Sequence, residues 1–287
     1  MQSEVETSGN QDAFWLLREA TPSDDKYSRG CVGFVTGSTR YPGAALLGIR
    51  TALNLGIGMV RYLGPTELAQ LVLLDRPEVV LGMDKAQSWV IGSGIADEDL
   101  SQAKNLELAA KSGLPLVVDA GALQQIELEQ IPNPEQCILT PHHREAARLL
   151  RRLGQSVDQR QIDAHPETFA LEINRLSGIP VLLKSARSVL VVRDDLGQPI
   201  VERMPLGNPL LAAAGSGDVL AAILGTLMAR AKSSSSAGSV PHDSLANIVR
   251  LGCQLHSKAA ELLAPTGELG SSRLADFVGR AAMQIRG

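Results

Sequence analysis

Short apolar runs alternate with longer amphipathic stretches along most of the chain. Five runs rich in Val, Ile and Leu predict buried strands, at residues 32–36, 88–91, 116–118, 137–139 and 181–183. Six longer stretches predict helices, at residues 42–55, 98–112, 144–153, 165–177, 216–230 and 245–263. Strands that are apolar on both faces and alternate with helices are typical of a parallel sheet covered on both sides. The pattern therefore predicts an α/β fold with a mostly parallel central sheet and helices on both faces.

Two further apolar runs, at residues 188–192 and 199–203, flank a turn at residues 193–198 that contains Asp194, Asp195 and Gly197. This arrangement predicts a β-hairpin late in the sheet. Each of the five earlier strands ends in Gly, Asp, Thr-Pro or Lys-Ser, so polar residues gather at the strand ends.

The chain is expected to form one domain. We assign residues 1–26 to an N-terminal extension and residues 27–287 to a single α/β domain. A Ser-rich stretch near residues 232–242 predicts a surface loop between two helices. Only about 45 residues follow it, which is too few for an independent domain.

Composition excludes several functional classes. A hydrophobic content of 44% is ample for a large core, and the formal net charge of −4 argues against a protein that binds nucleic-acid phosphates through a basic face. No signal peptide or apolar stretch of membrane-spanning length is visible. The three cysteines, Cys31, Cys137 and Cys253, lack metal-ligand spacing. We therefore expect reduced cysteines and a cytoplasmic protein with neither a nucleic-acid partner nor a membrane partner.

The most informative segment is residues 207–220, which passes from a turn of small residues directly into a helical pattern. Gly215 and Gly217 allow backbone N–H groups to converge, and the following helix N-terminus favours negative charge. We predict an anion hole formed by Gly215, Ser216 and Gly217. Asp218, in the first helical turn, could then accept a proton from a hydroxyl group that faces this hole.

The same four residues also fit an ordinary helix start. Ser216 would then be the N-cap, and Asp218 would only complement the helix dipole. Taken alone, residues 215–218 favour this simpler interpretation, because short Gly/Ser/Asp strings are common. The surrounding pattern decides between the two.

Six further blocks occur in a fixed order along the chain. They are Gly30, Gly33 and Gly37-Ser38; residues 41–45; residues 91–95; residues 118–123; residues 139–142 with Glu145; and Leu183-Lys184. Together with Gly207-Asn208 and residues 215–220, these blocks resemble the nucleotide-dependent NAD(P)H-hydrate dehydratases of the ribokinase-like superfamily. The resemblance covers about residues 27–264, and ordered blocks with compatible spacing are far more specific than any single motif.

The resemblance implies a ribokinase-like three-layer sandwich and a repair reaction. Members of the family use ADP or ATP to convert the S epimer of NADHX or NADPHX back to NADH or NADPH. The ring hydroxyl is phosphorylated and phosphate is then eliminated. Asp218 is the implied base, ADP is the favoured donor, and Mg²⁺ is expected with the nucleotide.

Individual site residues carry over from the matching blocks. The implied substrate-binding residues are Ala44, Ala45, Gly94, His142 and Asp218. The implied nucleotide-binding residues are Lys184, Ser185, Ala186, Arg187, Ser188 and Gly217. His142 could instead cap the next helix, and residues 184–188 could be a solvated turn. The metal ligands stay undefined: Asp119 and Glu145 are candidates, and either could equally be a cap or a hydrogen-bond acceptor.

The sequence departs from the family pattern at several positions. Ser185, Ala214 and Ser216 replace residues that are usually Gly, Gly and Thr, Arg29 stands where Lys is typical, and 143–144 replaces a typical Pro-Gly. Two alternatives stay open, the second of them suggested by the departures at Ser185, Ala214 and Arg29. One is a ribokinase-like kinase of a small alcohol, such as a vitamin precursor or sugar, and the other is a nucleotide-sensing relative without catalysis.

The resemblance also implies partners. We expect NADHX or NADPHX and ADP or ATP as small-molecule substrates, and a homo-oligomer, tetrameric by family resemblance. The epimerase activity found in this family belongs to another domain, so functional pairing with a separate epimerase is expected.

Overall fold

The computed structural model describes residues 8–234, 242–268 and 270–287. One sheet of nine strands runs through the described chain in the order β3-β2-β1-β4-β5-β6-β7-β8-β9. The strands are β1 Cys31–Val35, β2 Met59–Tyr62, β3 Val80–Leu81, β4 Ser88–Ile91, β5 Leu116–Val118, β6 Cys137–Leu139, β7 Val181–Leu183, β8 Val189–Arg193 and β9 Pro199–Arg203. All neighbours from β3 to β7 pair in parallel, and β8 and β9 add an antiparallel hairpin.

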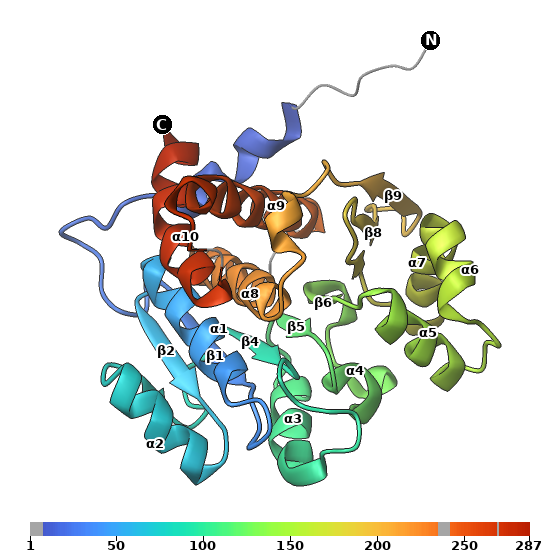
Figure 1. Ribbon diagram of the computed structural model, residues 1–287, viewed down its shortest axis with the longest axis horizontal. Coiled ribbons are helices and arrows are strands. Elements are labelled where there is room, and N and C mark those ends of the chain that lie inside the picture. The colour runs from blue at the N-terminus through green and yellow to red at the C-terminus, as the bar shows by residue number, and fades with distance from the viewer. Residues whose placement is uncertain (1–7, 235–241, 269) are drawn as a thin grey trace.

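Helices cover both faces of this sheet (Figure 1). The α-helices are α1 Gly43–Asn54, α2 Thr66–Asp75, α3 Ala103–Ala110, α4 Ala122–Gln125, α5 His143–Arg152, α6 Gln159–Ala164, α7 Pro166–Ser177, α8 Ser216–Ser234, α9 His242–Leu263 and α10 Ser271–Arg286. Helices α1, α2, α8, α9 and α10 share one apolar core with the sheet, and α3, α4, α5 and α7 share the other. The structure confirms the predicted α/β three-layer fold.

Alternation along each strand divides the side chains between the two cores. On β4, Val90 points into the core beneath α8, whereas Trp89 and Ile91 belong to the opposite core. Val117 and its neighbours Leu116 and Val118 divide in the same way on β5. Successive side chains of a strand point to opposite faces, so a strand buried on both faces is apolar at every position.

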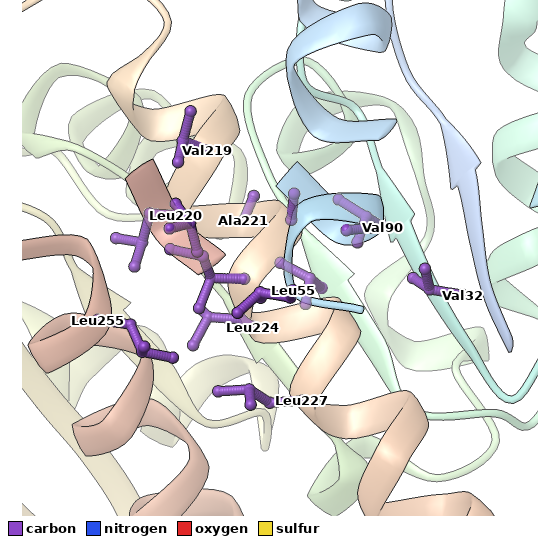
Figure 2. Packing of buried hydrophobic residues seen from close by; sticks show 14 of the residues in the cluster. Val32, Leu55, Val90, Val219, Leu220, Ala221, Leu224, Leu227 and Leu255 are labelled. Carbon is purple, nitrogen blue, oxygen red and sulfur yellow. The ribbon is translucent and has the colours of Figure 1, made fainter. Parts of the chain in front are cut away.

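Helix α8 crosses the middle of its core and lies directly against the sheet (Figure 2). Val219, Leu220, Leu224 and Leu227 are buried among residues of α1, α9 and the strands. A Cβ on Gly225 would overlap the side chain of Val90, so the glycine sets how closely the helix approaches β4. This packing fixes the N-terminal turn of α8 beside the carboxyl ends of the central strands.

The predicted strands, hairpin and six helices are all present within a few residues of their predicted bounds. The sequence interpretation missed β2, β3, α2, α4, α6 and α10. Strand β3 has only two residues, and α4 and α6 are too short to show a clear period. The Ser-rich loop was predicted too wide: α8 continues to Ser234 and α9 begins at His242, while 235–241 lies outside the described residues.

The first described segment, η1 Ser8–Leu17, is a 3₁₀-helix beside α9 and α10 (Figure 1). Ala13, Leu16 and Leu17 are buried in the core that contains α8. This part of the expected extension therefore packs on the domain. All three cysteines are free, and no helix within the described ranges is long and apolar enough to span a bilayer.

Candidate active site

The N-terminal turn of α8 has the geometry of an anion hole. Gly215 precedes the helix with φ 87°, a conformation that residues with a Cβ rarely adopt. The Ser216 hydroxyl donates to the Leu211 carbonyl at 2.6 Å, which fastens the turn. No hydrogen bond joins the amides of Gly217 and Asp218 to another described residue. These amides are therefore available to an anion at the positive end of the helix.

A buried ion pair lies beside this turn, at the carboxyl ends of β5 and β7. The Lys184 ammonium donates to Asp119 Oδ1 at 2.6 Å and lies 3.9 Å from Glu145 Oε2. A Cβ on Gly217 would lie 3.6 Å from Lys184 Nζ, so the ammonium faces the first turn of α8. The lysine thus links the strand ends to the anion hole.

Asp119 is held in its ionised form. Ser93 donates to its Oδ2 at 2.7 Å and Thr140 donates to its Oδ1 at 2.9 Å. Burial opposes ionisation, but the charge of Lys184 and these hydrogen bonds keep the pKa of Asp119 below its ordinary value. Burial likewise opposes the charge of Lys184, whereas Asp119 and Glu145 raise the pKa of the lysine.

His142 and Glu145 form the start of α5. Glu145 N donates to His142 Nδ1 at 3.2 Å, and His142 N donates to Glu145 Oε2 at 2.8 Å, which is a reciprocal capping box. Burial and nearby cations, Lys184 first, lower the pKa of His142 to about 4, so its ring is neutral near pH 7. Its side chain remains about half exposed at 49%. Both ring nitrogens thus face Glu145, because Nε2 also lies 3.4 Å from Glu145 Oε1.

Asp218 lies in the first turn of α8 and has a strongly shifted pKa. Burial, followed by repulsion from Asp119, raises its pKa to about 7, and Glu145 adds to the shift while Lys184 opposes it. Three carboxylates around one ammonium cannot all ionise at low cost. With a pKa of about 7, Asp218 can both accept and release a proton near neutral pH, which is the property of a general base.

Of the residues predicted to contact the substrate, Ala44 and Ala45 lie in the first turn of α1, and Gly94 lies in the loop after β4. A Cβ on Gly94 would overlap the Ala44 methyl group, so these two residues are in direct contact. Ala45 is buried beneath Gly37, and the Ser38 hydroxyl donates to the Gly94 carbonyl at 2.8 Å. The small residues let the loop after β1 lie against the loop after β4.

The predicted nucleotide segment forms the turn between β7 and β8. Ser185, Ala186 and Arg187 are exposed, and the amide of Gly207 donates to the Ala186 carbonyl at 2.8 Å. The Ser188 hydroxyl donates to the Ser185 carbonyl at 3.2 Å. The turn is thus tied to the segment that leads into the anion hole, next to Lys184.

Metal ligation has weak support from the side chains alone. No group of three or more His, Cys, Asp or Glu residues suited to a metal ion occurs in the part of the chain that the structure describes. Both oxygens of Asp119 already accept hydrogen bonds. Mg²⁺ that is bound largely by phosphates and water needs few protein ligands, so this site fits a nucleotide-borne ion better than a protein-held one.

Sequence reasoning missed three contributors. Ser93 and Thr140 lie inside quoted blocks but were given no role, although both hold Asp119. His256 of α9 is buried at 6% exposure behind the anion hole and bonds to the Ser216 backbone; burial lowers its pKa to about 4. A lone histidine in a helical pattern gave no signal for this position.

The fold is similar to that of a solved ribokinase-like superfamily protein from Enterococcus faecalis, with a TM-score of 0.73 at 19% identity over 99% of both chains. A solved ADP/ATP-dependent NAD(P)H-hydrate dehydratase from Bacillus subtilis has the same fold, with a TM-score of 0.74 at 23% identity over 96% of both chains.

Sequence comparison defines the family. The NAD(P)H-hydrate dehydratase family profile matches residues 32–275. The ADP-dependent (S)-NAD(P)H-hydrate dehydratase of Neisseria meningitidis is 30% identical over 94% of this chain and 90% of that protein. The bifunctional NAD(P)H-hydrate repair enzyme of Corynebacterium glutamicum is 34% identical over 75% of this chain, but the match spans only 38% of that longer protein. The chain belongs to the NAD(P)H-hydrate dehydratase family.

Proposed function

We propose that the protein catalyses the nucleotide-dependent dehydration of the S epimer of NADHX or NADPHX to NADH or NADPH. The proposal rests on Asp218, a base with a pKa of about 7 that lies in the first turn of α8 beside the free amides of the helix N-terminus. Family membership and the named activity of the Neisseria relative support the substrate class and favour ADP as donor.

In this proposal Asp218 accepts the proton of the ring hydroxyl as that oxygen attacks the terminal phosphoryl group of the nucleotide. An O–P bond forms at the ring hydroxyl, and the bond between the phosphoryl group and the nucleotide breaks. The free amides of Gly217 and Asp218 stabilise the charge that develops on the phosphoryl oxygens, whereas the Ser216 amide already donates to the Ala213 carbonyl at 3.2 Å. The Lys184 ammonium faces Gly217 and adds a positive charge beside the anion hole.

Elimination follows phosphorylation. The C–O bond breaks, phosphate leaves with the bonding electrons, and the ring nitrogen lone pair stabilises the cation that forms. Loss of a proton from the neighbouring ring carbon restores the conjugated ring. Phosphorylation is needed because hydroxide is a poor leaving group, whereas phosphate is a good one.

We assign the walls of the substrate site to Ala44, Ala45, Gly94 and His142. The contact between Gly94 and Ala44 supports this assignment, because it brings small residues of the loop after β4 and of the first turn of α1 together. His142 contributes a neutral, half-exposed ring that can contact a ligand without adding charge.

We assign the nucleotide to residues 184–188 and Gly217. This assignment is supported by the exposed turn after β7, which accepts a hydrogen bond from the Gly207 amide and lies next to the anion hole. The nucleotide would bring Mg²⁺ with its phosphates. In the free protein Lys184 is paired with Asp119, so nucleotide phosphates must compete with two carboxylates for its charge.

Assembly and context form part of the proposal. We infer a homotetramer, which the exposed apolar side chains of Leu71, Leu74, Val80 and Leu81 at one edge of the sheet support. We also infer one domain over residues 27–287, a cytoplasmic location, and an epimerase that supplies the S epimer. The bifunctional relatives, named as repair enzymes, support the last inference.

Absorbance at 340 nm tests the function. Wild-type protein, prepared NADHX, Mg²⁺ and either ADP or ATP should restore NADH absorbance, and omission of nucleotide should abolish the recovery. Asp218→Asn should lose the activity by a factor of about 10²–10⁴, the usual contribution of a positioned base. Asp195→Asn, a matched change in the exposed β8–β9 turn, should leave it intact.

The alternative of a small-alcohol kinase predicts a different result. The protein would then transfer phosphate to a small alcohol, and NADHX would not be converted with either nucleotide. A nucleotide-sensing relative would bind nucleotide without turnover of either substrate. These outcomes would contradict the proposed function.

A further inference from the structure

A cavity lies near the C-terminal end of α8, whereas Asp218 lies in the first turn of that helix. It has a volume of about 260 Å³ and is lined by η1, the segment before β1, the end of α1, the end of α8, and α10. Arg230 of α8 lines it, twelve residues after Asp218 on the same helix, which corresponds to about 18 Å along the helix axis. The cavity is therefore separate from the candidate active site.

Positive charge is concentrated in this cavity. Arg18, Arg29, Arg230 and Arg286 line it, with Glu19 as the acidic lining residue. Arg18 is paired with Asp24, and Arg286 is paired with Glu19. Neither Arg29 nor Arg230 has a carboxylate within ion-pair distance among the residues that the structure describes. Two guanidinium groups are thus left without anionic partners, in a protein whose net charge is −4.

Hydrogen bonds to backbone carbonyls use only part of the donor capacity of Arg29 and Arg230. Arg230 donates to the carbonyls of Leu16, Leu55 and Gly56 at 2.6, 2.6 and 2.9 Å, and Arg29 donates to Gly56 at 2.7 Å. Three of these bonds go to the end of α1, which carries roughly half a negative charge, and the fourth goes to Leu16 of η1. The two side chains present about ten N–H donors, of which these bonds use four. Both charge and donor capacity remain for a ligand.

The charge at Arg230 is energetically costly without a ligand. Burial, and then the neighbouring Arg29 and Arg18, lower the pKa of Arg230 to about 10. Guanidinium groups that repel one another in a partly buried place are relieved by a bound anion. The planar donor fork of arginine matches phosphate oxygens.

An apolar rim lies beside the arginines. Trp15 and Met283 line the cavity and remain 45% and 64% exposed. Indole and thioether groups offer contact surface to a flat ring. The volume is just below the range of roughly 300–1,000 Å³ that is typical of small-molecule pockets, so it suits a ligand much smaller than a dinucleotide.

We propose that this cavity is a second binding site, which takes a nucleoside monophosphate. Arg29 and Arg230 bind the phosphate group, and Trp15 and Met283 contact the base. The proposal is independent of the reaction at Asp218, because the two sites share no residue.

Tryptophan fluorescence can test the proposal on the whole chain. The protein has two tryptophans, Trp15 at the cavity and Trp89 buried at 1% exposure in the sheet. AMP is titrated at constant ionic strength, with adenosine and ribose 5-phosphate as separate probes. The variants are Arg29→Gln, Arg286→Gln, Trp15→Phe, and Arg280→Gln as a charge-matched control on the exposed side of α10.

AMP should quench the wild-type emission saturably, and Trp15→Phe should abolish the change. Arg29→Gln should raise the dissociation constant at least about tenfold, since hydrogen bonds to charged groups contribute about 1.5–3 kcal/mol. Arg286→Gln should raise it about two- to fivefold, and Arg280→Gln should not change it. Ribose 5-phosphate should compete with AMP, and adenosine should not.

Three results would overturn the proposal. They are the absence of saturable quenching by AMP, equal weakening by Arg29→Gln and Arg280→Gln, and a quench that persists in Trp15→Phe. Arg286→Gln keeps the test decisive if Arg29→Gln weakens the end of α1 and fails to fold. NADHX conversion by the Arg variants is measured separately and should equal that of the wild type, so failure of this site and failure of the proposed reaction are distinguishable.

Discussion

Asp218→Asn should make the protein more stable at alkaline pH while it removes the proposed base. Asp218 is partly buried near Asp119 and Glu145, and these surroundings raise its pKa from 3.8 to about 7. Asparagine has nearly the same shape as the protonated acid and cannot ionise. The substitution therefore removes the cost of a poorly solvated charge and little else.

The size and sign of this effect follow from proton linkage. With its raised pKa, Asp218 binds a proton more tightly in the folded protein than in the unfolded chain. Its contribution to stability is therefore most favourable below about pH 4, falls as the pH rises to about 7, and is constant above that. Each pKa unit corresponds to about 1.4 kcal/mol, so between pH 5 and pH 8 wild type should lose up to about 3 kcal/mol relative to Asp218→Asn.

Urea unfolding at pH 5 and pH 8 measures the effect. The free energies of unfolding of wild type and Asp218→Asn are compared at each pH, and their difference should grow by up to about 3 kcal/mol in favour of the variant. Asp119 and Glu145 titrate in both proteins, so most of their contribution cancels. Asp195→Asn, in the exposed turn, should show no growth in the difference.

A difference between wild type and Asp218→Asn that is the same at both pH values would refute the reasoning. It would mean that Asp218 ionises as easily in the folded protein as in the unfolded chain. A variant that is less stable than wild type at pH 8 would show instead that the charged carboxylate forms favourable contacts, and the base would then need another identity.

Three other measurements test the same structure. The kcat/KM for NADHX should rise with pH through about 7 as Asp218 loses its proton. Asp119→Asn removes a repelling carboxylate and should move the midpoint of this rise to lower pH. A profile that is flat from pH 5 to 9 would contradict the assignment of Asp218 as the base. Gly94→Ala should lower the free energy of unfolding by about 1–3 kcal/mol, because Gly94 has a φ of 70° and the new methyl group would overlap Ala44. The double variant that also carries Ala44→Gly should recover part of this loss, as measured by urea unfolding. Leu224→Ala, in the fully buried core beneath α8, should cost about 2–5 kcal/mol by the same assay, and a loss below 1 kcal/mol would show that this core is loosely packed.

The central strands could be predicted from sequence because burial on both faces leaves a continuous apolar run. Strands β4, β5, β6 and β7 each show this pattern and end in a polar residue or glycine. Strand β2 contains Arg61 and lies near the sheet edge, so its run is interrupted, and β3 is too short to register. The edge formed by β2 and β3 was therefore not predicted, whereas the central strands and the β8–β9 hairpin were predicted correctly.

Helix α10 was missed for a different reason. Its buried residues Leu274, Phe277, Val278 and Ala281 follow a helical period, but the charged residues Asp276 and Arg280 between them reduce the apparent hydrophobicity of the stretch. The period of the apolar positions, rather than their number, was the usable signal. Attention to that period would have extended the predicted fold to the end of the chain.

Local motifs and distant contacts contribute differently to the site. The turn at residues 215–218 is local, so its glycines and its aspartate could be predicted from a short stretch of sequence. The pKa of Asp218 is not local: it depends on Asp119 and Glu145, which lie about 70 to 100 residues earlier in the chain and reach the same edge because parallel strands end there. No inspection of residues 215–218 alone could have shown that this aspartate is the easily protonated member of the cluster.

Lys184 is central to the site because it lies between the carboxylates and the first turn of α8. Lys184 is held by Asp119 at 2.6 Å and faces Gly217, so it offsets two carboxylates before any ligand arrives. A bound phosphate would draw this charge toward itself and weaken its attraction for Asp218 and Asp119 alike. Because Lys184 opposes the raised pKa of Asp218, nucleotide binding at this point should raise the proton affinity of Asp218 further. The base would then hold the substrate proton most firmly while the phosphoryl group is being transferred.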